Sequence, residues 1–379
     1  AGIAMLLPEL SAESYFAWTS VGADGAQNAS SVFAPMTGAT RLIVGFAWPA
    51  FILLAWLRNK GGALRLDRKD AVSLSLLFLA ALYAFNIYIK GYVSILDSAV
   101  LALLFVVFVW MNGRRSARKK RLTKENLALA FETESDARRV MSLVLFGYAA
   151  IATLIVSGRF AASLTSIGGS LGSEQFVLAQ FAMPLASKGA WLALVGALIW
   201  NARSGHAVRM LLMAQAGLWT LLIAVLPVIS LFHGAMLGQT DVLMLDARQK
   251  SELLLAASQT VFALALLSSM AVSWRSAVVM LGLSVAQGAF AALQPEADST
   301  AVQGIFSAIY LIIAALVVTR NQARVHVLSG LINVNIPSGL RRPPEAESVR
   351  QRRRRVGQPQ LARAESQIAG RLQAHPDIT

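Results

Sequence analysis

Two glutamates share the first apolar stretch of the chain, which reads MLLPELSAESYFAW. Glu9 directly follows Pro8, and Glu13 comes one turn later on the same face of a helix. A carboxylate in an apolar segment is costly unless it faces a partner or a cavity, and such groups mark ion pathways in membrane proteins. We therefore predict a cation site at Glu9 and Glu13. The alternative is that both glutamates lie at the membrane interface.

A lysine lies near the middle of another long apolar stretch, within the sequence PLASKGAW. Lys188 is too far from either end of this stretch for its ammonium group to reach the interface easily. Pro184 removes a backbone donor and Gly189 tolerates distortion, so we expect a broken helix here. We predict that Lys188, next to Ser187, lies opposite Glu9 as an internal cation. The alternative is a structural kink in which Lys188 pairs with a backbone carbonyl.

Amide and hydroxyl side chains in neighbouring apolar stretches are further candidate ion ligands. Thr37 and Thr40 lie in MTGATRLIVG, Gln180 precedes PLASKGAW, and Gln215 lies in AQAGLWTLLIA. Together with the two glutamates, Ser187 and Lys188, they make up the predicted ion site. Gly217 in the last of these sequences is explained equally well by helix packing.

The composition is that of a membrane protein. Of the 379 residues, 56% are hydrophobic and 14% are charged, whereas soluble domains carry about a quarter charged residues. Apolar runs long enough to cross a hydrocarbon core of about 30 Å recur along the chain. Backbone groups in lipid must be hydrogen-bonded within the protein, and helices achieve this. The sequence predicts an all-α polytopic membrane protein.

The apolar segments also predict the organisation of the chain. We expect about ten transmembrane helices, at about 1–18, 39–57, 70–88, 93–111, 139–160, 173–200, 207–233, 252–270, 277–294 and 301–319. The first segment begins abruptly at Ala1, so we expect that upstream residues are missing. The predicted parts are a first transmembrane half at 1–111, a basic linker at 112–138, a second half at 139–320 and a disordered Arg-rich tail at 335–379.

Basic residues indicate the orientation in the membrane. The net charge is +14, and Lys and Arg gather in the loops 58–69, 112–138, 201–206 and 271–276 and in the tail. Alternate threading puts all of these on one side, which the positive-inside rule places in the cytoplasm. We expect an integral protein of the bacterial plasma membrane. Its linker and tail, including Arg352 to Arg355, should contact anionic lipid rather than nucleic acid.

Other kinds of chemistry find no support in the sequence. The chain has no cysteine, which excludes thiolate chemistry, and its four histidines are scattered without metal-ligand spacing. A nucleophile paired with a base is not apparent either. We expect no catalytic residues, no cofactor and no metal beyond a transported cation at Glu9.

Two blocks of the chain have the pattern of an inverted repeat. At about 5–52 and 183–231, a Pro-bearing helix precedes a helix that starts with small and polar residues. The first block begins with a segment that runs from inside to outside, whereas the segment 173–200 runs from outside to inside. Antiparallel repeats with broken helices that meet near the bilayer centre are typical of secondary transporters.

These blocks resemble the two alpha repeats of the sodium/calcium exchanger (cation/calcium antiporter) superfamily, especially bacterial sodium/calcium or sodium/proton exchangers. LLPELSAESYFAW and APMTGATRLIVG look like the first repeat, and PLASKGAW with QAGLWTLLIAVLPV looks like the second. The resemblance covers about 1–52 and 173–231. It implies that an acidic residue after a proline, with amide or hydroxyl residues of the next helix, binds the cation. Glu9 occupies the acidic position of the first repeat.

The second repeat is degenerate by comparison with the family. Relatives tend to read Pro-Leu-Ala-Ser-Glu-Ala-Pro-Glu, but this chain has Lys188 in place of one glutamate and Ala190 and Trp191 in place of the last two residues. Calcium prefers six to eight oxygen ligands, including carboxylates. Sodium or protons therefore fit the site better than calcium.

Two functions follow from the resemblance. The first is a secondary-active cation antiporter with alternating access around an intramembrane site formed by Glu9 and Lys188. The second is a transport-inactive exchanger scaffold with a regulatory or assembly role through its basic linker and tail.

Overall fold

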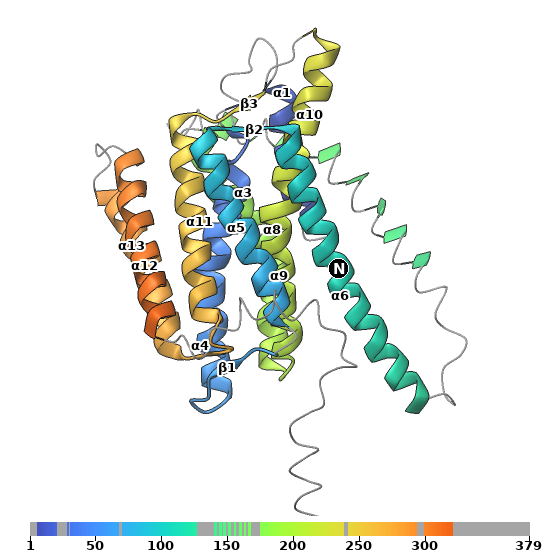
Figure 1. Cartoon of the computed structure of the whole chain (residues 1–379), viewed down its shortest axis with the longest axis vertical. Helices are drawn as coiled ribbons and strands as arrows, with labels where there is room; N and C mark the ends of the chain where they lie inside the picture. Colours follow the sequence, from blue (N-terminus) through green and yellow to red (C-terminus); the bar gives the residue numbers. More distant parts are fainter. Residues whose placement is uncertain are drawn as a thin grey trace, which may run out of the picture. The chain divides into compact units, whose positions relative to one another are not determined.

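The computed structural model describes residues 6–20, 29, 31–67, 70–126, 175–238, 242–293 and 299–320, with scattered residues between 140 and 167. These residues form long helices joined by short loops and by two pairs of two-residue strands (Figure 1). The predicted all-α polytopic membrane fold is confirmed.

The first half contains a set of helices that start at prolines. In chain order its elements are α1 (Leu7–Thr19), α3 (Ala34–Leu42), the π-helical segment η2 (Ile43–Ala47), α4 (Trp48–Arg58), β1 (Leu64–Arg65), α5 (Ala71–Lys90), β2 (Tyr92–Val93) and α6 (Ile95–Asn126). Pro8 and Pro35 lie in the first turns of α1 and α3, where a backbone N–H would have no helical acceptor. Pro49 lies in the first turn of α4, which continues directly from the π-helical segment η2. Gly91 ends α5 with a φ of 76°, which glycine adopts without strain.

The second half repeats the order of elements. It consists of α8 (Gln175–Trp200), α9 (Ser204–Gly217), the π-helical segment η4 (Leu218–Leu222), α10 (Ile223–Met236), β3 (Leu243–Met244), α11 (Ala247–Leu267), β4 (Ala271–Val272), α12 (Trp274–Leu293) and α13 (Ser299–Arg320). Asp246 and Gln249 form a reciprocal capping box at the start of α11.

The two halves are related as inverted repeats. In each half, a Pro-bearing helix precedes a long helix with a five-residue π-helical segment, η2 or η4. The short strands pair between halves, because β1 pairs with β4 and β2 pairs with β3. β1 lies at one end of the bundle, and β2 and β3 lie at the other (Figure 1). When the first half is superposed on the second, the β1–β4 pair takes the place of the β2–β3 pair at the opposite end of the bundle. A two-fold axis in the membrane plane has this effect.

Seven described helical spans are long and apolar enough to cross a membrane: Ala34–Arg58, Ala71–Lys90, Ile95–Asn112, Val177–Trp200, Ser204–Met236, Ala247–Leu267 and Thr300–Arg320. The predicted first and ninth segments correspond to α1 and α12. Within the predicted segment 139–160 the structure describes scattered residues, and those that it describes are helical. Helix α6 continues to Asn126, so the first part of the predicted linker is helical. The rest of the linker and the tail 335–379 lie outside the described residues.

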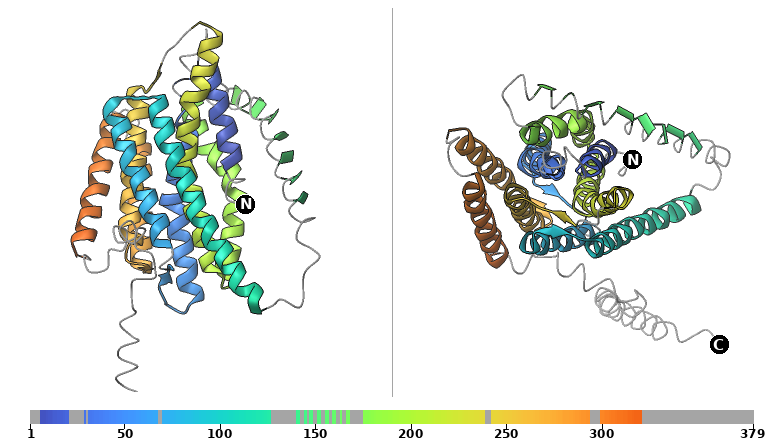
Figure 2. Two further views of the ribbon diagram at one scale, coloured as in Figure 1. Left: turned by 45° about the vertical axis from the view of Figure 1, so that its right-hand side comes forward. Right: turned by 90° about the horizontal axis from the view of Figure 1, so that it is seen from above.

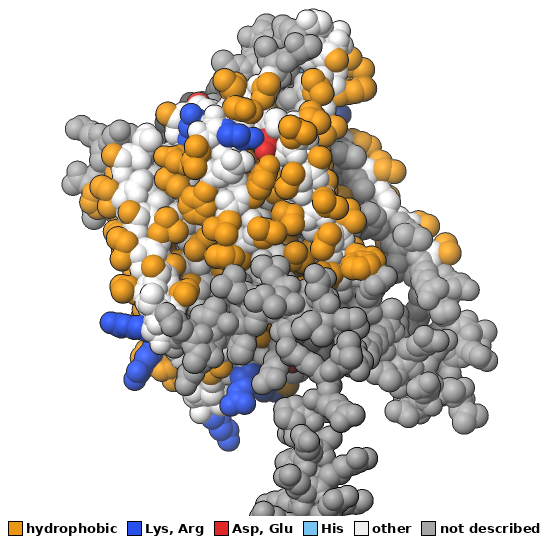
Figure 3. All heavy atoms as spheres, in the orientation of Figure 1, with side chains coloured by type: hydrophobic (Ala, Val, Ile, Leu, Met, Phe, Trp, Pro, Cys, Tyr) orange, Lys and Arg blue, Asp and Glu red, His pale blue; other side chains and the backbone are white. Residues whose placement is uncertain are grey.

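Loops that the sequence assigns to one side of the membrane lie at one end of the bundle. The β1–β4 pair joins the loop 58–69 to the loop 271–276. Arg209, near the start of α9, reaches Asp67 in the first of these loops at 2.6 Å. Figure 3 shows Lys and Arg side chains at this end, below a surface with many hydrophobic side chains. Exposed basic residues of these loops are Arg58, Lys60, Arg65, Arg203 and Arg275.

The central helices α1, α3, α8 and α10 stand next to one another when the bundle is seen from above (Figure 2). α3 packs against α8, and α1 packs against α10 and η4, so the first repeat interlocks with the second. Two glycines permit this close approach. A Cβ atom on Gly38 would lie 1.8 Å from the Gln180 carbonyl oxygen, and one on Gly217 would lie 2.0 Å from the Leu6 side chain.

The predicted break in α8 is wrong, because this helix runs without interruption from Gln175 to Trp200 with Pro184 inside it. Proline cannot donate to the carbonyl four residues earlier, which belongs to Gln180. That carbonyl lies against Gly38 of α3, so a close helix contact covers a backbone oxygen that lacks its usual helical donor. Helix packing around an internal proline is the usual way for a transmembrane helix to retain it. The departures from α-helical geometry are instead η2 and η4, in the following helices.

We predict that Gly38→Ala lowers stability by about 1–3 kcal/mol, because the new methyl group would overlap the Gln180 backbone. The check is thermal unfolding in detergent. Gly282→Ala on α12 is the matched control, because a Cβ atom there has no neighbour within 4 Å. Equal melting temperatures for both variants would contradict the proposed packing of α3 on α8.

Candidate functional site

A buried ion pair joins the two repeats at the centre of the bundle. Lys188 Nζ of α8 lies 2.7 Å from Glu9 Oε2 of α1, and both side chains are fully buried. Ser187 Oγ donates a hydrogen bond to the other carboxylate oxygen of Glu9. Two charge-assisted contacts therefore compensate this carboxylate. The contact expected between Glu9 and Lys188 is present, and both Glu9 and Glu13 are fully buried within the protein.

Glu13 lies one turn after Glu9 and is also fully buried. Neither of its carboxylate oxygens has a side-chain hydrogen-bond partner in the described part of the chain. The groups close enough to act on it electrostatically are Glu9, Lys188 and the backbone amide of Met36. Met36 lies in the first turn of α3, where amide N–H groups lack helical acceptors. The end of α3 therefore offers a weak positive potential to Glu13, but no ion-pair partner.

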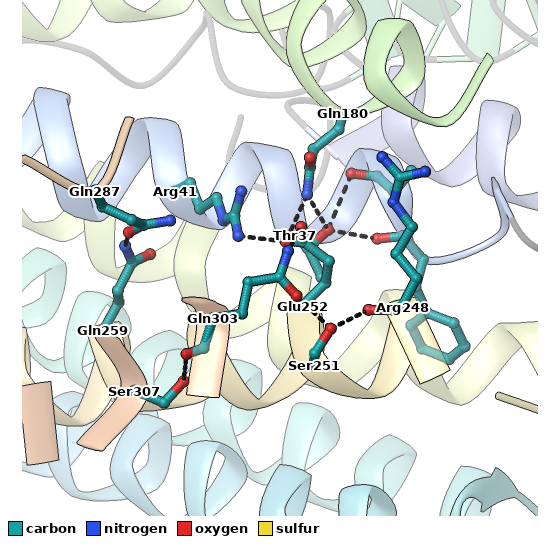
Figure 4. A network of polar contacts seen from close by, with 12 residues as sticks. Thr37, Arg41, Gln180, Arg248, Ser251, Glu252, Gln259, Gln287, Gln303 and Ser307 are labelled. Carbon is teal, nitrogen blue, oxygen red and sulfur yellow. Dashed lines mark hydrogen bonds and ion pairs between the residues drawn. The ribbon is translucent and has the colours of Figure 1, made fainter. Parts of the chain in front are cut away.

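A second buried charge network surrounds Glu252 of α11 (Figure 4). Arg41 of α3 forms an ion pair with Glu252, and Gln303 of α13 donates to its second oxygen. Gln180 Nε2 of α8 lies 2.7 Å from Glu252 and 3.4 Å from the hydroxyl oxygen of Thr37. Four helices thus contribute to one network.

Sequence reasoning missed this network because its charged members lie close to predicted segment ends. Arg41 is close to the start of the predicted segment 39–57, but it lies well within the observed span Ala34–Arg58, and its side chain is only 13% exposed. Glu252 marked the expected start of a segment, whereas α11 begins at Ala247. One feature of the sequence could have indicated the pair. Arg41 and Glu252 have opposite charges, and each lies near the start of a predicted segment that begins on the same side of the membrane.

The remaining predicted ligands do not join the central ion pair. Gln215 Nε2 lies 3.4 Å from the hydroxyl of Thr260, which also accepts a hydrogen bond from Trp219 at 3.1 Å. Thr40 is buried, and its hydroxyl has no hydrogen-bond partner among the described residues. The structure therefore groups Glu9, Ser187 and Lys188 with Glu13 nearby, and it places Thr37 and Gln180 in the Glu252 network. Along α8, Gln180 and Lys188 are separated by an axial rise of about 12 Å.

Comparison with known proteins identifies the fold. The sequence matches no protein-family model and no curated protein. Among solved structures, it is similar to the H+/Ca2+ exchanger CAX, with 27% identity and a TM-score of 0.72 over 88% of this chain and 81% of that one. The chain belongs to the cation/calcium antiporter superfamily. The sodium-calcium exchanger NCX_Mj shares the fold at 17% identity, with a TM-score of 0.50 over 76% of this chain and 83% of that one.

Membership of this superfamily makes the chain an integral membrane protein among transporters rather than enzymes. Groups of three or more His, Cys, Asp or Glu side chains that could hold a metal do not occur in the described ranges. The ammonium group of Lys188 instead lies against the carboxylate of Glu9.

We predict that Glu252→Gln lowers stability by about 3–5 kcal/mol, because it leaves the Arg41 guanidinium buried without a counter-charge. Thermal unfolding in detergent measures the effect. Asp67→Asn serves as the control, because this carboxylate is 59% exposed in its pair with Arg209 and should be worth no more than about 1 kcal/mol. If the two variants melt together, the Glu252 network does not hold the four helices in place.

Proposed function

We propose that this member of the superfamily is a secondary-active cation antiporter with alternating access around the site of Glu9 and Lys188. The inverted repeats support this proposal, because exchange of two equivalent arrangements is the usual basis of alternating access in such folds. The central helices come from both repeats, and the ion pair joins α1 of one to α8 of the other. A rearrangement of either repeat would therefore act directly on the site.

The position of Lys188 supports our choice of transported ion. Its ammonium group lies 2.7 Å from Glu9, where it supplies the positive charge that a bound cation would otherwise supply. A calcium ion at Glu9 would have to displace this ammonium or share the carboxylate with it, and it would find few of the oxygen ligands that it prefers. Sodium ions or protons are the coupling ions that we propose.

The second candidate function is a transport-inactive scaffold. The presence of a lysine at position 188 also favours this function. Lys188 neutralises the charge of Glu9, and the ion pair could hold α1 and α8 in one arrangement. Such a protein would act through regulation or assembly. The two functions differ in one measurable property, which is ion flux driven by a gradient across a membrane.

Flux in proteoliposomes distinguishes them. We expect the purified protein to exchange sodium for protons, and we expect no flux driven by calcium. Well-folded protein that moves none of these ions would contradict the antiporter and favour the scaffold.

We predict that Lys188→Glu raises the preference for calcium over sodium at least about tenfold, or about 1.4 kcal/mol. The substitution replaces the internal cation by a third carboxylate next to Glu9 and Glu13. Competition between calcium and sodium in the flux assay measures the preference. Lys60→Glu makes the same charge change at an exposed loop position, and its ion preference should stay that of the wild type. An unchanged preference in Lys188→Glu would show that Lys188 does not exclude calcium.

A further inference from the structure

Glu13 differs from every other buried acidic side chain that the structure describes. Glu9 pairs with Lys188 at 2.7 Å, Asp97 with Lys90 at 2.5 Å, Asp70 with Arg209 at 3.2 Å, and Glu252 with Arg41. Glu13 has no ion pair and no side-chain hydrogen bond to either carboxylate oxygen, although it is fully buried, and among the described residues only the backbone N–H of Met36 faces it as a donor. Each of the other buried carboxylates thus has a basic partner, and Glu13 has none.

An isolated carboxylate cannot remain charged in such surroundings at a moderate cost. Transfer of an unpaired ionised group into an apolar interior is so unfavourable that the group is neutralised, by a proton or by a cation. The charged groups that face Glu13 are Glu9 on its own helix and Lys188 on α8, and the Met36 amide faces it from α3. Lys188 brings only one positive charge, and it already pairs with Glu9 at 2.7 Å. The two carboxylates and the ammonium group therefore keep one uncompensated negative charge.

We propose that Glu13 is the residue that carries the transported ion, as a proton in one state and as a single monovalent cation in the other. The pair of Glu9 and Lys188 stays intact through the cycle and positions α1 against α8. This inference rests on the proposed antiporter function and assigns its ion-carrying group.

The charge of the site sets the number of ions. Glu9, Glu13 and Lys188 together carry one negative charge when all three are ionised. One proton or one sodium ion makes the site neutral, whereas a calcium ion would leave a buried excess positive charge, which is costly in a membrane interior. Both loaded states are therefore neutral. Exchange of one sodium ion for one proton follows, and the exchange should move no net charge across the membrane.

Two measurements on the same purified protein test this inference. In detergent with little buffer, a pH indicator reports the protons released when sodium chloride is added. In proteoliposomes, sodium-driven proton flux is measured with and without a membrane potential. We expect one proton released per wild-type protein and flux that is insensitive to the potential.

Glu13→Gln should release no proton and lose flux, because an amide can neither give up the proton nor hold the cation. Its melting temperature should not fall, since glutamine has the shape of the neutral acid. Glu13→Asp keeps the carboxylate and should keep the proton release. Asp97→Asn is the matched control, because it removes a different buried carboxylate, one that is already paired, and it should release one proton like the wild type.

The outcomes separate this inference from the proposed function. Flux that persists in Glu13→Gln, or one proton still released by that variant, overturns the role of Glu13 and leaves the antiporter standing. Potential-driven flux in the wild type contradicts the one-for-one neutral exchange. A folded wild type with neither flux nor proton release overturns the antiporter and the inference with it.

Discussion

The ion pair between Glu9 and Lys188 is the interaction around which this membrane protein is organised. A lysine in the middle of an apolar helix is tolerated only next to a counter-charge, and its partner lies on the first central helix of the other repeat. The pair therefore fixes how α1 lies against α8. It also sets the electrostatics of the site, because the ammonium group takes the place of positive charge that a mobile cation would bring.

Close backbone packing allows the ion pair to form. Pro184 leaves the Gln180 carbonyl without its helical donor, and Gly38 brings α3 against that carbonyl. Gly217 plays the corresponding part on the other side, where the helix that carries η4 approaches Leu6 next to α1. Each repeat thus uses a glycine on its second helix to reach the first helix of the other repeat. The Glu252 network then ties α3 and α8 to α11 and α13.

Hydropathy and rare polar residues predicted much of this arrangement. Runs of apolar residues predicted the membrane helices, and the loop charges predicted which loops lie together, because both depend on local composition. The pairing of Glu9 with Lys188 could be predicted because each is an exceptional residue within its apolar stretch. The network of Arg41 and Glu252 could not, because residues near segment ends look like ordinary interfacial charges until the helix bounds are known. The π-helical segments have no residue pattern of their own, and the continuity of α8 depends on a neighbour, Gly38, that is far away in sequence.

An experimental structure of the protein saturated with sodium, compared with one at low sodium, tests the central claim most directly. The account predicts that Lys188 Nζ stays in contact with Glu9 in both structures and that sodium binds at Glu13. A sodium ion held between Glu9 and Ser187, with Lys188 turned away from them, would contradict it.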